Sequence, residues 1–236
     1  MLPTKAYAAP SLGAPIGPWQ IERREPRPDD VLIDILYCGI CHSDIHFAHG
    51  QFPGAVFHAV PGHEIVGKVV KTGSAVKKHK VGDIVGVGCM VDSCGHCHDC
   101  EDGEEQFCNQ MIGTYAGTED GKPTYGGYSQ RITVNEDFAL KISPKLSPAA
   151  AAPLLCAGIT LYSPLRHWKV GKGSKVAIIG LGGLGHMGVK LAAAMGAEVT
   201  VFSTSEKKRA DAMRLGAHNF AVSTDPETFT RLANTF

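Results

Sequence analysis

Residues 175–203 read KVAIIGLGGLGHMGVKLAAAMGAEVTVFS, an apolar run, a glycine-rich turn, an alanine-rich stretch and a second apolar run. This order predicts a buried strand, a tight turn that opens a helix, and a second strand. In such a context G-x-G-x-x-G is typical of dinucleotide binding, because the glycines permit the turn, the approach of a pyrophosphate and the packing of helix on strand. The residues expected to bind the dinucleotide are Gly180, Gly182, Gly183, Leu184 and Gly185.

The segments that follow continue the alternation of strand and helix. We expect a helix over 205–217, a third strand over 218–223, and a further helix capped by Asp225. Strands alternating with helices imply a parallel α/β sheet. A doubly wound sheet has six strands in two halves. The sequence therefore predicts a Rossmann domain that stops after its first half.

The end of the second predicted strand bears on the choice of cofactor. An acidic residue that would bind the ribose 2′-hydroxyl of NAD is missing there, where residues 201–209 read VFSTSEKKR. We expect Ser203, Thr204, Ser205 and Lys208 to receive a 2′-phosphate instead, which favours NADP(H). The alternative is that the basic residues form only a solvated helix face.

The part of the chain before this region has a different character. Residues 18–90 contain short runs rich in Val and Ile, separated by Gly and Pro, which is a β-rich pattern. Ser147 and Pro148 then form a good start for a helix that runs on through an alanine-rich stretch. We expect two domains, over residues 1–155 and 156–236.

Composition excludes several classes of protein. The 236 residues carry 23 basic and 23 acidic side chains, and no apolar run approaches the roughly 18 residues that cross a bilayer. We therefore expect no binding of nucleic acid or membrane, and, since no apolar leader stands at the N-terminus, a cytoplasmic location.

Four cysteines are spaced as metal ligands within a polar lobe at residues 91–110. Their pattern, C-x2-C-x2-C-x7-C, lets four thiolates converge on a closed structural zinc site. An iron–sulfur cluster would favour a shorter last spacing followed by proline, and the cysteines could instead form disulfides or stay unliganded in the core. The predicted ligands are Cys94, Cys97, Cys100 and Cys108.

A second group of candidate ligands begins with CGICHSDIH at residues 38–46. Cys38, Cys41, His42 and His46 form a poor cage by themselves, because CGIC lies in a strand-like run in which neighbours point to opposite faces. His63 and Cys156 offer a further imidazole and thiolate. Two thiolates and an imidazole from distant segments suit a catalytic zinc, although Cys156 alone would be a small core residue.

With these motifs the chain resembles the zinc-dependent medium-chain alcohol dehydrogenases, most closely their cinnamyl-alcohol-dehydrogenase-like branch. The resemblance rests on CGICHSDIH, on GHEIVGKVVKTGSAV at 62–76, on the four cysteines, and on LLCAGIT at 154–160. It implies a GroES-like β-barrel domain before the Rossmann domain, two zinc ions, and NADPH-dependent reduction of aldehydes to primary alcohols, or the reverse.

The resemblance also implies a role for each matching residue. Cys41, His63 and Cys156 would bind the catalytic zinc, with Glu64 beside it and Asp44 accepting the second ring N–H of His63. Ser43 and His46 would relay a proton to solvent. His42 would approach the pyrophosphate, and Thr160 the nicotinamide.

Phe52, Met90 and Gly113 would line the substrate pocket, where glycine replaces a tryptophan of the lignin-pathway members and favours a broad range of aldehydes. Cys38 and Cys89 match no ligand and are expected in the core.

Further consequences concern the whole molecule. The family forms homodimers, but the sheet edge that pairs in the dimer is missing from this sequence. One alternative to an active enzyme is therefore a catalytically impaired, zinc-binding remnant. Another is a zinc or redox sensor that uses the cysteine lobe.

Overall fold

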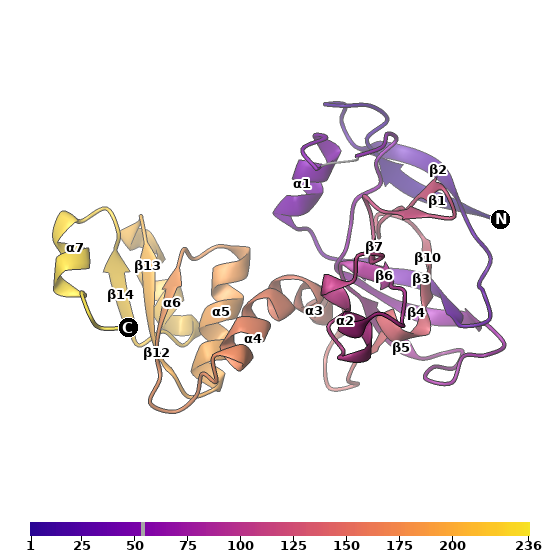
Figure 1. Cartoon of the computed structure of the whole chain (residues 1–236). Coiled ribbons are helices and arrows are strands. Elements are labelled where there is room, and N and C mark those ends of the chain that lie inside the picture. The colour runs from indigo at the N-terminus through magenta and orange to yellow at the C-terminus, as the bar shows by residue number, and fades with distance from the viewer. Residues whose placement is uncertain (53–54) are drawn as a thin grey trace. The chain divides into compact units, whose positions relative to one another are not determined.

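The computed structural model describes residues 1–52 and 55–236. Contacts divide the chain into two compact units, Met1–Cys156 and Ala157–Phe236. The first unit is built from strands and short helices, and the second from alternating helices and parallel strands (Figure 1). Among the described residues no single helix is long and apolar enough to cross a membrane; the bent pair Pro148–Leu155 and Ala157–His167 passes only on combined length and composition.

The first unit is organised around a five-stranded antiparallel sheet in the order β10-β3-β4-β5-β11. Valine and isoleucine side chains fill its core, including Ile33, Val69 and Val85, all of which are fully buried. The hairpin of β1 and β2 is connected to the rest through a bridge between Ala6 and Ser129. The strands are β1 (Leu2–Ala8), β2 (Gly17–Arg23), β3 (Asp30–Cys38), β4 (Ile65–Thr72), β5 (Ile84–Val87), β10 (Arg131–Asn135) and β11 (Leu140–Lys141).

The cysteine-rich lobe of this unit has little regular structure. Between residues 93 and 110 the only buried residue is Cys108. Such a lobe has no apolar core of its own, so another interaction must hold it together. The short elements in and around it are β6 (Met90–Asp92), α2 (His98–Glu101), η1 (Glu105–Phe107), β7 (Ile112–Gly113), β8 (Thr118–Glu119) and β9 (Lys122–Pro123).

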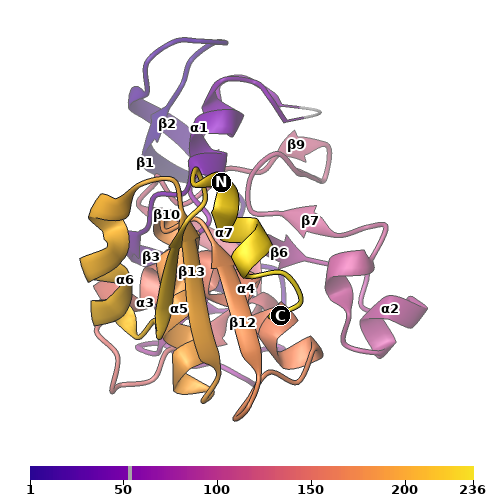
Figure 2. The same ribbon diagram turned by 90° about the vertical axis from the view of Figure 1, so that its left-hand side faces the viewer.

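The second unit contains a parallel sheet in the order β12-β13-β14, as the sequence predicts. Val199 and Val201 of β13 face a core shared with α4, α5 and α6, whereas Phe202 stacks on Phe229 of α7 at 5.7 Å. Figure 2 shows α7 and α5 on opposite sides of this sheet. The elements are α4 (Ala157–His167), β12 (Lys175–Ile179), α5 (Gly183–Ala194), β13 (Glu198–Ser203), η4 (Glu206–Lys208), α6 (Arg209–Leu215), β14 (Asn219–Val222) and α7 (Pro226–Arg231).

Both predicted helix caps are confirmed. Ser147 Oγ accepts a hydrogen bond from the Ala150 amide at 3.2 Å, and Asp225 Oδ1 accepts one from the Glu227 amide at 3.0 Å. The helix after Ser147 is shorter than expected, however. It consists of α3 (Pro148–Ala151) and a 3-10 turn η3 (Ala152–Leu155), and it breaks at Cys156, where φ is −129°. Pro153 contributes to the break, since it has no amide hydrogen to donate within the helix.

Two expectations about the first unit are wrong. CGIC does not lie in a strand, because β3 ends at Cys38 and Cys41 is the N-cap of α1 (His42–Ala48). Cys89, expected in the core, is exposed, whereas Cys38 is half-buried against the main core.

Gly39, the residue directly after β3, lies against Glu64. Its amide donates to the Glu64 carbonyl at 2.9 Å, and a Cβ at this position would lie 2.0 Å from Glu64 Oε2. Only glycine permits this approach. The turn that follows brings Cys41 to the start of α1 and toward the segment that carries His63.

Candidate functional site

The four cysteines of the lobe form a closed donor set. Their sulfur atoms all lie within 4.8 Å of one another, and Cys94 Sγ is 3.9 Å from Cys100 Sγ. Zinc–sulfur bonds of about 2.3 Å in a tetrahedron place the sulfur atoms roughly 3.8 Å apart. The spacing in the structure thus matches that of a tetrahedral zinc site, and all eight cysteines of the chain are outside disulfides.

Main-chain amides stabilise negative charge on these sulfur atoms. The Cys97 amide donates to Cys94 Sγ and the Gln110 amide to Cys108 Sγ, both at 3.3 Å. The pKa of Cys94 is lowered, first by the amide of His96. The pKa of Cys97 is raised to about 12, because the amide of Cys100 is outweighed by the neighbouring thiols. Four crowded thiolates repel one another, and a bound cation would remove this repulsion.

A second donor set contains Cys41, His63, Glu64 and Cys156, whose ligand atoms also lie within 4.8 Å of one another. Cys41 begins α1, and Cys156 lies between η3 and α4. His63 and Glu64 immediately precede β4 and are both 3% exposed. Cys41 Sγ and Cys156 Sγ are 3.9 Å apart, again the spacing of two thiolates on one zinc ion. Both sets of side chains therefore fit zinc.

Asp44 organises the second donor set. Its Oδ2 accepts from the Cys41 amide at 2.9 Å and its Oδ1 from the Gly62 amide at 2.9 Å. His63 Nδ1 lies 3.3 Å from Oδ1, although the angle falls short of a hydrogen bond. Burial opposes ionisation of Asp44, but His63 and the two amides outweigh it, so its pKa is below the ordinary value. The predicted pairing of Asp44 with His63 thus has a short contact in the structure.

Tyr128 is a neighbour of Asp44 that the sequence did not reveal. Its hydroxyl donates to Asp44 Oδ2 at 3.1 Å. Burial, and then the charge of Asp44, raise the pKa of Tyr128 well above its ordinary value, so the phenol stays protonated and acts as a donor. A single tyrosine in GGYSQRITV has no sequence signature that would have indicated this role.

His63 and Cys156 have raised pKa values when no cation is present. Burial lowers the pKa of His63, but Asp44 and Cys156 outweigh burial and raise it to about 10. The pKa of Cys156 is raised, first by the thiol of Cys89 and also by burial. A metal ion would displace these protons, since only thiolate and neutral imidazole are ligands.

The predicted proton-relay residues lie together on α1. Ser43 is half-buried, and His46 is exposed and hydrogen-bonds through Nδ1 to Gln51. His42 is exposed, and its ring lies 4.8 Å from that of His46. One helical face therefore carries two imidazoles from the neighbourhood of Cys41 to solvent.

Tyr115, which sequence reasoning missed, lies near one of the predicted pocket residues. Met90 pairs with Gly113 across β6 and β7. The Phe52 ring lies 6.3 Å from that of Tyr115, and the Tyr115 ring lies 5.2 Å from His63. The Tyr115 ring therefore lies near both His63 and Phe52. No pattern in the sequence indicates this, because the contact joins distant segments.

The glycine-rich turn has the geometry expected of a dinucleotide site. Gly180 has φ +86°, which favours glycine. A Cβ on Gly185 would lie 1.9 Å from the Gly180 carbonyl oxygen, whereas one on Gly182 or Gly183 would meet open space. The first and third glycines of the motif are thus required by the fold, and the second leaves room for a ligand at the start of α5. Leu184 is 43% exposed beside them.

Of the residues predicted to receive a 2′-phosphate, one contacts the turn directly. Lys208 Nζ donates to the Leu181 carbonyl at 3.0 Å. Ser203 is buried and its Oγ accepts from the Ser205 amide at 3.3 Å, whereas Thr204 is exposed. Thr160 is exposed on α4.

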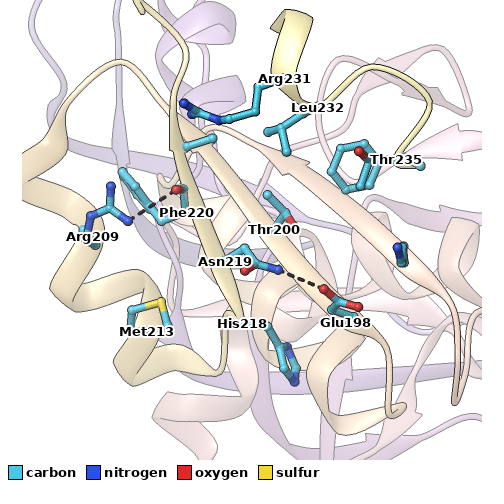
Figure 3. A pocket seen from close by; sticks show the side chains of 13 residues that line it. Glu198, Thr200, Arg209, Met213, His218, Asn219, Phe220, Arg231, Leu232 and Thr235 are labelled. Atoms are coloured by element: carbon cyan, nitrogen blue, oxygen red, sulfur yellow. Dashed lines mark hydrogen bonds between the residues drawn. The ribbon is translucent and has the colours of Figure 1, made fainter. Parts of the chain in front are cut away.

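A pocket of about 370 Å³ in the second unit has none of these predicted residues in its lining. Figure 3 shows its wall, where Asn219 donates to Glu198 and Arg209 to the Phe220 carbonyl. Lys175, Glu198 and Asn219, the first residues of the three strands, line it. Parallel sheets bind ligands at the opposite, carboxyl ends of their strands, so this pocket is unsuited to the dinucleotide.

Comparison with known proteins agrees with this arrangement. Residues 27–144 match the family model of the alcohol dehydrogenase GroES-like domain, and residues 183–234 match that of zinc-binding dehydrogenases. The chain belongs to the zinc-type medium-chain alcohol dehydrogenases. The resemblance stated from the motifs is confirmed, and so is the order of a GroES-like domain followed by a Rossmann domain.

Named relatives and solved structures of this family are similar over nearly the whole chain. Aldehyde reductase YahK of Escherichia coli is 57% identical over 90% of this chain, and NADP-dependent alcohol dehydrogenase C 1 of Mycolicibacterium smegmatis is 55% identical over all of it. A cinnamyl alcohol dehydrogenase structure from Sorghum bicolor superposes with TM-score 0.96 at 41% identity, covering 99% of the chain. The match spans 62%, 68% and 68% of these three proteins, respectively.

Proposed function

We propose that this dehydrogenase chain, with two zinc ions and NADP(H) bound, interconverts aldehydes and primary alcohols. The observation that carries the proposal is the contrast between the two donor sets. The lobe offers four thiolates, which fill a tetrahedral shell, whereas the second set offers two thiolates, an imidazole and a carboxylate. Closed thiolate shells are structural, and mixed sets that leave a position for substrate are catalytic.

Chemistry at the second set needs groups that the chain does not supply. When bound, zinc polarises a carbonyl oxygen and NADPH donates a hydride. The chain's own side chains bind and orient these groups: Cys41, His63 and Cys156 supply the donor atoms, and Asp44 fixes His63. Glu64 lies beside them as a further carboxylate. The lobe cysteines hold the structural ion and so fix the segment that leads to β7.

Proton transfer falls to residues of α1. The oxygen of a reduced aldehyde must gain a proton in a site with little water. We assign to Ser43 the donation of this proton, and to His42 and His46, whose rings lie 4.8 Å apart, the connection of α1 with solvent. Ser43 and His46 are therefore assigned to the relay, and His42 also to the cofactor pyrophosphate.

NADP(H) is proposed as the cofactor and a broad range of aldehydes as substrates. Gly180, Gly182, Gly183, Leu184 and Gly185 would bind the pyrophosphate, with Thr160 at the nicotinamide. Ser203, Thr204, Ser205 and Lys208 would receive the 2′-phosphate. Relatives named as an aldehyde reductase and as an NADP-dependent alcohol dehydrogenase support this choice. Phe52, Met90, Gly113 and Tyr115 would shape the substrate pocket, and the small Gly113 favours breadth.

The experiment is NADPH oxidation by the purified chain with benzaldehyde or a short aliphatic aldehyde. A Cys41→Ala variant is the control, and the zinc content of both proteins is measured beside activity. Turnover that disappears in the variant supports the proposal. No turnover in folded, zinc-loaded protein favours the second candidate, a zinc-binding chain that is catalytically impaired.

Further properties of the protein stay predictions. We expect binding of a small-molecule substrate, no binding of nucleic acid or membrane, and a cytoplasmic location. The homodimer expected from the family is tested by sedimentation analysis of the chain.

A further inference from the structure

The carboxylate of Asp44 accepts a hydrogen bond from Tyr128, a residue that does not belong to the ligand segments. The amides of Cys41 and Gly62, and the ring of His63, all lie in or beside the residues that supply ligands. The fourth contact, from the Tyr128 hydroxyl at 3.1 Å, comes from 84 residues further along the chain. Tyr128 thus fixes Asp44 from outside the group that Asp44 itself organises.

Tyr128 is itself held in place by main-chain contacts. Its amide donates to the Pro61 carbonyl at 2.9 Å, and its carbonyl accepts from the Tyr7 amide of β1 at 2.7 Å. Gly62, at φ +103°, leaves space for the phenol, since a Cβ there would lie 2.7 Å from Tyr128 Cδ1. The ring therefore has one position, directly over the segment that ends in His63.

A buried arginine fixes the loop that carries Tyr128. Arg23 of β2 is 8% exposed. Its guanidinium donates to the carbonyls of Arg131, Tyr125 and Gly126 at 2.9, 2.7 and 2.9 Å, and to Ser129 Oγ at 2.9 Å. The planar guanidinium of Arg23 thus hydrogen-bonds to residues on both sides of Tyr128, and this restricts movement of the whole loop.

We propose that Tyr128 is a positioning residue of the second metal centre, holding the Asp44 carboxylate in the orientation from which it fixes Cys41 and His63. The inference rests on the proposed function. The two amides give each carboxylate oxygen one donor, and the Tyr128 hydroxyl adds a second donor to Oδ2 from a distant segment, which further restricts rotation of the carboxylate. Residues that support the metal ligands through hydrogen bonds keep those ligands within the narrow geometry that metal binding requires.

The experiment compares Tyr128→Phe with wild type in the full chain. The variant removes one oxygen atom and keeps the ring, so folding is preserved. Zinc affinity is measured by competition with a chelator, and the second centre is also loaded with Co²⁺ to record its visible spectrum. The four-cysteine site serves as an internal reference in the same molecule. Tyr125→Phe is the matched control, because this phenol lies in the same loop but stacks on His58 at 5.5 Å.

We expect Tyr128→Phe to weaken zinc binding at the second centre by about 10-fold, the lower end of the range for outer partners of a metal ligand. The Co²⁺ spectrum should shift, while the four-cysteine site and the Tyr125→Phe variant stay as in wild type. An unchanged affinity and spectrum overturn the inference. Equal weakening at both zinc sites also overturns it, since that result indicates a general loss of stability.

Failure of the proposed function gives a different result. Wild-type protein that binds zinc at both sites but reduces no aldehyde contradicts the proposed activity, and the comparison of zinc affinities still decides the role of Tyr128.

Discussion

Cys41 and Cys156 hold their sulfur atoms 3.9 Å apart although 115 residues separate them in the sequence. One lies at the start of α1, and the other at the break between η3 and α4. A metal ion bound between them would join the start of α1 to the last residue of the first unit. Binding there would therefore stabilise the fold as well as supply the chemistry.

Replacement of Cys156 tests this second donor set. Cys156→Ser removes a thiolate and should lower the zinc content by about one ion per chain, because a hydroxyl is a poor zinc ligand. Elemental analysis after dialysis measures it. Cys89→Ser is the control: this exposed cysteine interacts with Cys156 but is outside the donor set, so the variant should keep both ions. Loss of a zinc ion from Cys89→Ser would contradict the proposed donor set, because it would indicate that Cys89 is itself a ligand.

Replacement of Cys100 tests the lobe. The lobe has Cys108 as its one buried residue, so Cys100→Ser should unfold residues 93–110 locally. We expect faster proteolytic cleavage within this range and a Tm lower by roughly 10 °C, corresponding to about 3–4 kcal/mol in a chain of this size. Thermal unfolding and limited proteolysis measure these effects. A lobe that resists cleavage with its zinc lost would contradict a structural role for the metal.

Two glycines of the nucleotide turn should respond differently to the same substitution. In Gly185→Ala the new Cβ would lie 1.9 Å from the Gly180 carbonyl oxygen, so the free energy of unfolding should fall by about 1–3 kcal/mol. In Gly182→Ala the Cβ would meet open space. This variant should keep wild-type stability and bind NADPH more weakly, because the methyl group would occupy the pyrophosphate position. Urea unfolding measures the stability of each variant, and NADPH fluorescence titration measures its cofactor affinity. A lower free energy of unfolding in Gly182→Ala than in wild type would contradict the view that Gly182 leaves room for a ligand and is not required by the fold.

The metal-free protein should lose stability at alkaline pH through His63. Burial opposes its proton, but Asp44 and Cys156 outweigh burial and raise the pKa from 6.5 to about 10. A group whose pKa rises on folding stabilises fully below its unfolded pKa, and this stabilisation is lost as the pH rises through the folded pKa. The free energy of unfolding should therefore fall between pH 6.5 and 10.

Urea unfolding of chelator-treated protein across this range measures the fall, and a His63→Gln variant is the control. In the variant, the free energy of unfolding should lack the part of its pH dependence that comes from His63. Parallel pH profiles for wild type and variant would show that His63 does not keep its proton.

Local signals made the second unit and the cysteine lobe predictable. The glycine-rich turn, its flanking strands and the cap at Asp225 depend on neighbours within a few residues. The lobe cysteines are likewise close in sequence, so spacing alone indicated a zinc site. For the second donor set, spacing gave only candidates, and the resemblance to a family was needed to select Cys41 rather than Cys38 or His46.

Contacts between distant segments caused the errors and omissions. The sequence suggested that CGIC continues a strand, but β3 ends at Cys38 and Gly39 then lies against Glu64. Tyr115 and Tyr128 reach the site by packing against residues far away in sequence. A lone tyrosine carries no periodicity or spacing, so its role becomes visible only when the fold brings it to His63 or Asp44.

The buried Arg23 gives a last test of how the site is supported. Arg23→Lys keeps the charge but loses the planar fork, so several of the four acceptors in residues 125–131 would lack a donor. We expect a loss of about 2–4 kcal/mol in the free energy of unfolding, since buried carbonyls left unpaired are costly. Arg131→Lys is the matched control: its guanidinium is 41% exposed and pairs with Asp34 at the surface, so its effect should stay below about 0.5 kcal/mol. Urea unfolding measures both variants. Equal losses would mean that the fork of Arg23 contributes no more than a surface ion pair, and that the Tyr128 loop is fixed by its main-chain contacts alone.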